Sequence, residues 1–312
     1  MKHSRAVLSL VIAAVLAGDA RATTVDSPVG RPSLRDATEM SSPEVGRAPW
    51  GTGPSSPEPA AAAANLDESQ IEIAYAEPRN AELRPYYEEL RRRRVLEELR
   101  QFLSPLLLPR KLLVKTDECG VETVRYEPGE AVVVCYEYVA RIVKLAPASA
   151  TPSGISRENA IVGAFVQAVL HKVSYAVFDL LKIPVWGRVD DAADRLAAFV
   201  MLQFGKDVAL KTLTGAVWFF EASNRTWTGS DFARETSPES QRIYNYLCVA
   251  YGSDPPKYED IVRDTLLKTR RARRCVEEHR QLERSFRDTI LPHLDPGRLA
   301  KVQATQWLEP EN

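Results

Sequence analysis

The stretch Val169–Asp194 reads V-L-H-K-V-S-Y-A-V-F-D-L-L-K-I-P-V-W-G-R-V-D-D-A-A-D, and it decides how the rest of the chain is interpreted. His171 and Tyr175 are one helical turn apart, so a helix places both side chains on one face. Pro184 ends that helix, and a second helix begins near Asp190. The pattern predicts two consecutive helices, one carrying a histidine and the next beginning with carboxylates.

Zinc peptidases use the same one-turn spacing in H-E-x-x-H, where two histidines bind the metal and the Glu is the general base. Here the letters are H-K-V-S-Y, so His171 is kept, Lys172 stands at the general-base position and Tyr175 replaces the second histidine. Asp190 and Asp194 then form a carboxylate-x-x-x-Asp pattern on the second helix. This pattern resembles the Glu-x-x-x-Asp of gluzincins, whose first acid is the third zinc ligand and whose Asp orients a ligand histidine.

Further stretches follow the same ordered pattern: E-C-G at Glu118–Gly120, V-C-Y-E at Val134–Glu137, Q-R-I-Y-N-Y-L-C at Gln241–Cys248 and Y-G-S-D-P at Tyr251–Pro255. With the helix pair, they resemble a bacterial family of exported putative metallopeptidases whose helix reads H-E-x-G-H-A. The resemblance covers roughly Tyr87 to Glu278. It implies a gluzincin-like domain that descends from a zinc peptidase.

The chain departs from the family pattern where the chemistry would occur. Ser174 replaces the glycine of the motif, and Asp190 is one methylene shorter than the expected Glu. R-E-T-S at Arg234–Ser237 resembles a segment that usually carries a histidine, but Thr236 stands there, while His279 and His293 lie outside the matched motifs. The resemblance therefore implies a degenerate metal site at His171, Tyr175 and Asp190. It also implies that Asp194 orients the histidine and that no catalytic residue is intact.

The N-terminal residues have the pattern of a signal peptide. A basic start precedes the apolar run Ala6–Gly18, which is shorter than the ~20 residues of a membrane span, and Ala20–Ala22 is a small-x-small cleavage site. We expect residues 1–22 to be removed on export to the periplasm or medium. Residues 23–68 are rich in Pro, Ser, Gly and Ala and predict a disordered linker. Residues 69–312 form the expected domain, and no later run is expected to span a membrane.

Periodicity predicts a mainly helical α+β domain with a small antiparallel sheet near its start. The expected strands cover 111–115, 122–126 and 131–135, with E-P-G-E as the turn between the latter two. The expected helices cover 81–108, 157–181, a segment from Asp190, 206–220, 238–251, 258–267 and 269–290.

Net charge and the basic run speak against a nucleic-acid partner. The formal net charge is -1, so no overall positive field favours a polyanion. The run Arg91–Arg94 lies between Glu88, Glu89, Glu97 and Glu98. It is interpreted as a solvated helix face with ion pairs one turn apart.

Four cysteines, Cys119, Cys135, Cys248 and Cys275, lie beyond the signal segment. An even number in an exported chain favours two disulfides, and three pairings are open. Cys119 and Cys135 flank a predicted hairpin, and the other two lie on successive helical stretches, which favours local pairing. No C-x-x-C pair occurs, so a cysteine zinc site is disfavoured.

Three functional hypotheses follow. The leading one is a metallopeptidase fold whose zinc centre has been lost and which acts by binding a peptide or protein partner. No cofactor is expected; the one metal that the remaining side chains leave as an option is zinc. Loss of the general base alone costs ~10²–10⁴-fold in rate. The second is an active zinc hydrolase that uses His171, Asp190 and Tyr175. The third is a structural envelope or secreted protein that depends on its linker, residues 23–68.

Overall fold

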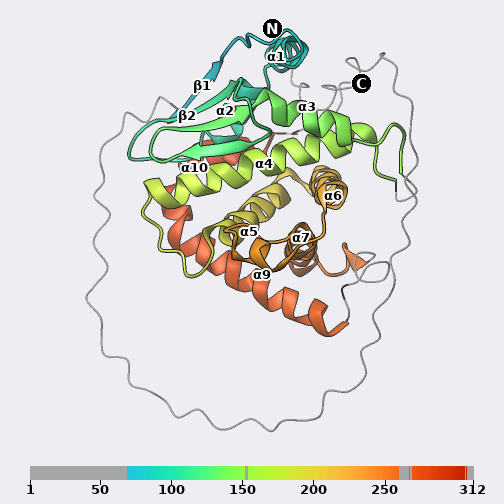
Figure 1. Cartoon of the computed structure of the whole chain (residues 1–312). Helices are drawn as coiled ribbons and strands as arrows, with labels where there is room; N and C mark the ends of the chain where they lie inside the picture. The colour runs from blue at the N-terminus through green and yellow to red at the C-terminus, as the bar shows by residue number, and fades with distance from the viewer. Residues whose placement is uncertain (1–68, 152–153, 260–266, 268, 306, 308–312) are drawn as a thin grey trace. The chain divides into compact units, whose positions relative to one another are not determined.

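The computed structural model describes residues 69–151, 154–259, 267, 269–305 and 307. A four-stranded sheet near the start is followed by helices (Figure 1). The strands are β1 (Ile71–Tyr75), β2 (Leu112–Asp117), β3 (Val124–Glu127) and β4 (Ala131–Cys135). The α-helices are α1 (Arg84–Arg92), α2 (Val95–Leu103), α3 (Tyr136–Leu145), α4 (Arg157–Leu180), α5 (Val189–Met201), α6 (Lys206–Ser223), α7 (Glu239–Ser253), α9 (Thr269–Thr289) and α10 (Pro296–Gln303). Short 3₁₀ turns are η1 (Leu202–Phe204), η2 (Gly229–Ala233) and η3 (Leu291–His293).

The predicted mainly helical α+β class is confirmed, but the sheet is mixed. Its order is β1-β2-β4-β3, with β1–β2 and β2–β4 parallel and only β3–β4 antiparallel. The antiparallel prediction is therefore correct for the β3–β4 hairpin and wrong for β2. The side chains of β2 alternate between buried and half-buried, which is typical of a strand. The strands that pair with β2 depend on residues distant in sequence. The signal peptide and the linker predicted for residues 1–68 lie outside the described residues, as does most of the predicted helix 258–267.

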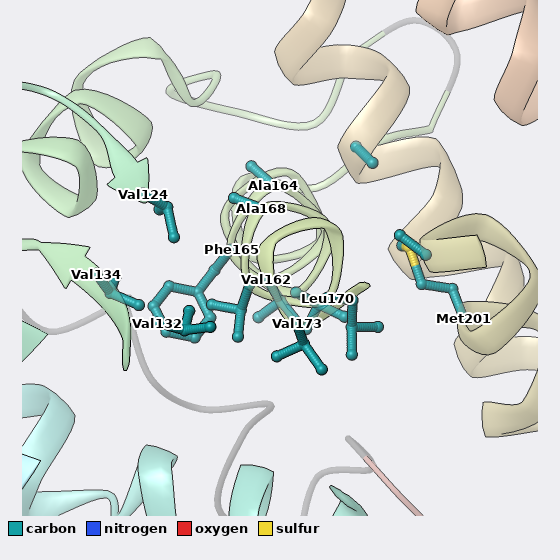
Figure 2. Close-up of a cluster of buried hydrophobic side chains, with 14 of the residues drawn as sticks. Val124, Val132, Val134, Val162, Ala164, Phe165, Ala168, Leu170, Val173 and Met201 are labelled. Atoms are coloured by element: carbon teal, nitrogen blue, oxygen red, sulfur yellow. The ribbon is translucent and has the colours of Figure 1, made fainter. Parts of the chain in front are cut away.

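Helix α4 lies at the centre of the core, and its predicted range was correct to within one residue. Ser156 caps its start, where the Oγ accepts a hydrogen bond from the Asn159 amide at 3.1 Å. Figure 2 shows Phe165 of α4 directed toward Val132 and Val134 of β4. On another side, α4 packs closely on α6: a Cβ at Gly163 would collide with backbone atoms of α6. These contacts fix the position of α4, whose second half carries His171 and Tyr175.

By length and composition, α4 is the one helix among the described residues that could cross a membrane. The core helix of a folded protein passes the same test, so this property does not contradict the expectation that no later run spans a membrane. Within the structure, 83% of its most apolar window is buried. Burial against the sheet and other helices is what a core helix of a folded domain shows.

The expected helix over 81–108 is two helices, because the chain turns at Arg94, which has a left-handed φ of 57°. The turn brings Arg93 inward, where it is 7% exposed and ion-paired with Glu89. The remaining arginines of the run Arg91–Arg94 are exposed, as predicted. Arg93 differs because the break between α1 and α2 removes it from the solvated face.

Both predicted disulfides form. Cys119 bonds Cys135 with a Cα–Cα distance of 5.5 Å, and Cys248 bonds Cys275 at 5.0 Å. The first joins the loop after β2 to the end of β4, and the second joins α7 to α9. Disulfides of this kind are typical of proteins that fold in an oxidising compartment. Cys119, Cys135 and Glu137 also bring three potential metal-ligand atoms together, but both sulfurs are bonded and neither is a thiolate.

Candidate functional site

The histidine of α4 lies between two carboxylates of α5. His171 Nδ1 is 2.7 Å from Asp194 Oδ1, and Nε2 is 3.0 Å from Asp190 Oδ1. All three side chains are buried, with exposed fractions of 4% for His171, 2% for Asp190 and 0% for Asp194. A ring protonated on both nitrogens donates to both carboxylates, whereas a neutral ring donates to one. Both nitrogens of His171 are therefore engaged within the protein.

Tyr175 joins the cluster from the next turn of α4. Its hydroxyl donates to Asp190 Oδ1 at 3.0 Å, so His171, Tyr175 and Asp190 meet at one oxygen atom. Burial, followed by the charge and hydrogen bond of Asp190, raises the pKa of Tyr175 above its ordinary value. The phenol therefore keeps its proton at neutral pH. The structure thus brings together the three residues that the sequence predicted as metal positions.

The two oxygens of Asp190 are used unequally. Oδ1 accepts from both His171 and Tyr175, whereas the buried Oδ2 has no hydrogen-bond partner among the described residues. Burial opposes ionisation of Asp190, but the hydrogen bond and charge of His171 outweigh it and lower the pKa. The cluster therefore contains an ionised carboxylate with one oxygen free to accept.

Asp194 has the role that the pattern predicted, since it holds the Nδ1 side of His171. It also accepts a two-pronged pair from Arg242 of α7, with Nε–Oδ2 and Nη2–Oδ1 distances of 2.7 Å each. Tyr246 and Gln167 approach Oδ1 at 3.4 Å and meet each other at 3.1 Å. Burial opposes ionisation of Asp194, but Arg242 and then His171 outweigh it and hold its pKa well below the usual range.

Sequence reasoning did not identify Arg242, Tyr246 and Gln167 as site residues. The available signal was the stretch Gln241–Cys248, quoted above for its resemblance, in which Arg242 and Tyr246 are one helical turn apart. Gln167 lies on α4, one turn before His171, whereas Arg242 and Tyr246 belong to α7, and α5 packs against both helices (Figure 1).

Lys172, at the general-base position, faces the same cluster. Its Nζ lies 4.3 Å from the centroid of the Tyr175 ring. Burial lowers the pKa of Lys172, and the charge of Asp190 opposes this shift. The side-chain amine of Lys172 therefore lies beside Tyr175 within the cluster.

The loop before α7 is tied to the start of α5. Ser237 Oγ donates to Asp191 at 2.6 Å, and Arg188 donates to Ser237 Oγ and to the Phe232 carbonyl, both at 3.3 Å. The segment R-E-T-S is therefore joined to the helix that carries Asp190 and Asp194. The negative charge of Glu235 in this segment acts to raise the pKa values of Lys172 and Tyr175. Thr236, the position at which a histidine is expected, brings no ligand nitrogen.

Comparison with protein families matches residues 75–290, from the last residue of β1 to just past the end of α9, to the family described as Putative metallopeptidase. The matched range is more than half of the chain and contains the whole cluster. The chain belongs to this family. No curated protein and no solved structure gives a match. The metallopeptidase family thus includes a chain whose helix carries H-K-V-S-Y.

Proposed function

We propose that this chain is an exported, catalytically inactive member of the metallopeptidase family that binds a peptide or protein partner. The observation that carries the proposal is Lys172 at the general-base position, with its ammonium group over the ring of Tyr175. The resemblance places a carboxylate base at this position, and loss of that base costs ~10²–10⁴-fold in rate.

The family implies a zinc ion, and the donor set of this cluster does not fit one. A catalytic zinc of this class takes three protein ligands and a water molecule. His171 Nε2 and the free Oδ2 of Asp190 are suitable donors. Tyr175 keeps its proton because its pKa is raised, and a phenol is a poor ligand until it ionises. The set is therefore one ligand short. The positive charge of Lys172 further opposes the binding of a dication.

A binding role is supported by what surrounds the cluster. Trp186, in the loop between α4 and α5, is 97% exposed, and Phe232 in η2 is 56% exposed. Arg188 links these loops through the Phe232 carbonyl and Ser237. Exposed aromatic side chains with a nearby arginine are typical of the residues that contribute most to protein interfaces. The partner would contact these exposed side chains of the two loops rather than the buried His171.

The test is zinc content and peptide cleavage of protein purified without chelators or a histidine tag. Wild-type protein is expected to hold far less than one zinc per chain and to leave peptides uncut. A variant combining Lys172→Glu, Ser174→Gly, Tyr175→His and Asp190→Glu restores the family letters and is expected to bind zinc. Lys182→Glu, an exposed charge reversal just after α4, is the matched control. Stoichiometric zinc in the wild type, with chelator-sensitive cleavage, would overturn the proposal.

One observation favours a second candidate, the zinc hydrolase with an altered ligand set. His171, Tyr175 and Asp190 do converge, and Asp190 Oδ2 is buried without a partner among the described residues. This candidate requires His171→Ala and Asp190→Ala each to lose both metal and activity. Unchanged activity in either variant excludes it.

The proposed export has its own test. The signal pattern predicts cleavage after Ala22, and the disulfides Cys119–Cys135 and Cys248–Cys275 are consistent with an oxidising destination. N-terminal sequencing of the protein from the expressing cells is expected to begin at Thr23. An intact Met1 on the folded, disulfide-bonded protein contradicts it.

A further inference from the structure

A cavity of about 200 Å³ lies beside the helices that carry the histidine cluster. Leu170, Val173 and Val177 of α4 line one wall, and Leu196 and Phe199 of α5 line the next. Leu170 and Val173 leave α4 on the same side, opposite to Ala164 (Figure 2). Side chains of α2, α9, η3 and α10 complete the enclosure. The charged residues of the cluster, on α4, α5 and α7, are not part of this lining.

The cavity walls offer carbon atoms and almost no hydrogen-bonding capacity. Of the polar lining residues, Ser174 donates its hydroxyl to the Leu170 carbonyl at 2.8 Å, and Gln203 donates to the Phe199 carbonyl at 3.2 Å. Among the residues that the structure describes, no charged side chain lines the cavity. A ligand inside must therefore be apolar, because an unpaired polar or charged group would lose its hydration without compensation.

The cavity meets solvent where its lining residues are exposed. These are Gln203 after α5, Gln303 at the end of α10, and Leu291, which is 40% exposed. The side-chain amides at this rim suit an uncharged polar group, and no lining residue supplies a counter-ion. A ligand with an apolar body and a neutral polar end matches both the apolar walls and the rim with its side-chain amides.

Size and shape favour a chain over a compact ring. The lining runs from Leu170 to Val177 on α4 and from Leu196 to Gln203 across α5 and η1, which at ~1.5 Å per residue is roughly 10 Å in each case. A compact apolar cavity of roughly 150 Å³ already accepts benzene. We infer that this cavity is a binding site for the alkyl chain of a neutral amphiphile, such as a long-chain alcohol or ester.

The chain's own C-terminus is the competing occupant. Residues 308–312 read L-E-P-E-N, which places two carboxylates close to a single leucine. Such a segment is poorly matched to walls without a charged or free donor group. The inference also does not depend on the proposed peptide-binding function, because it uses a different surface of α4.

The experiment measures binding of straight-chain 1-alkanols to the full-length protein by isothermal titration calorimetry. Affinity is expected to rise about fourfold for each added methylene until the cavity is filled. The carboxylate of equal chain length is expected to bind at least about tenfold more weakly, because its charge has no partner at the rim. This series uses the wild type and does not depend on a variant that folds.

Variants localise the binding. Val173→Phe fills the cavity and is expected to weaken decanol binding at least about tenfold, whereas Val189→Phe adds the same ring at an exposed position of α5 and leaves it unchanged. Circular dichroism checks that both variants fold. Affinity that ignores chain length, or that folded Val173→Phe retains, overturns the inference. So does binding that appears only after removal of residues 308–312, which identifies the C-terminus as the occupant.

Discussion

The two sides of the His171 ring differ in how completely they are bonded. On the Nδ1 side, both oxygens of Asp194 are engaged, and Arg242, Tyr246 and Gln167 surround them. On the Nε2 side, Asp190 Oδ1 is shared by the histidine and Tyr175, and Oδ2 has no partner among the described residues. The side that orients the histidine is complete, whereas the side that would meet metal and substrate is not. Stability should therefore depend on Asp194 and Arg242 far more than on Asp190 and Tyr175.

The largest effect is expected from breaking the complete side. Arg242→Met leaves the buried charge of Asp194 without its partner, which costs about 3–5 kcal/mol. Chemical denaturation is the measurement. Arg195→Met on α5 is the matched control, because its half-exposed pair with Glu278 is worth about 1 kcal/mol or less. Equal losses in the two variants would mean that the Asp194 network has no special weight.

An intermediate effect is expected from pH. Because the folded-state pKa of Asp194 lies below its unfolded value, its contribution is present above pH ~4 and is lost as the pH falls below that value. The drop in Tm between pH 5 and pH 3 should be smaller in Asp194→Asn than in wild type. Asp190→Asn should reduce the drop less, since its carboxylate has fewer partners. The reverse order of the two variants contradicts the comparison.

The smallest effect is expected on the incomplete side. Tyr175→Phe removes one hydrogen bond to an oxygen that still faces His171, so the loss should be about 1 kcal/mol. Denaturant midpoints of the variant and wild type provide the measurement. A loss as large as that of Arg242→Met would show that Tyr175 supports the fold as strongly as Arg242 does.

Much of the fold followed from local sequence patterns. The cap at Ser156, the apolar run after it and the breaker Pro184 predicted α4 closely, because helix ends depend on neighbouring residues. The disulfide pairs were also local: Cys119 and Cys135 flank one hairpin. Strand β1 was not predicted, since a short strand directly after an Ala-rich stretch has little local signal. Its parallel pairing with β2 depends on residues about forty positions away.

The candidate site was predicted in part. The one-turn spacing of His171 and Tyr175, and the carboxylates at the start of the next helix, were sufficient to predict which side chains meet. Arg242 was missed because an arginine on a helix is usually solvated, and nothing local indicates that α7 packs against α5. Arg93 was assigned to a solvated face for the same reason, and it is buried.

The sequence by itself determined that Lys172 directly follows His171 in H-K-V-S-Y, and to which family the chain belongs. These are properties of residue identity and order, which no folding can alter. Only the tertiary structure decided that His171 lies between two carboxylates, that Arg242 neutralises one of them and that the other keeps a free oxygen. Those facts depend on distances of a few ångströms between three helices, and such distances arise from packing across the whole core.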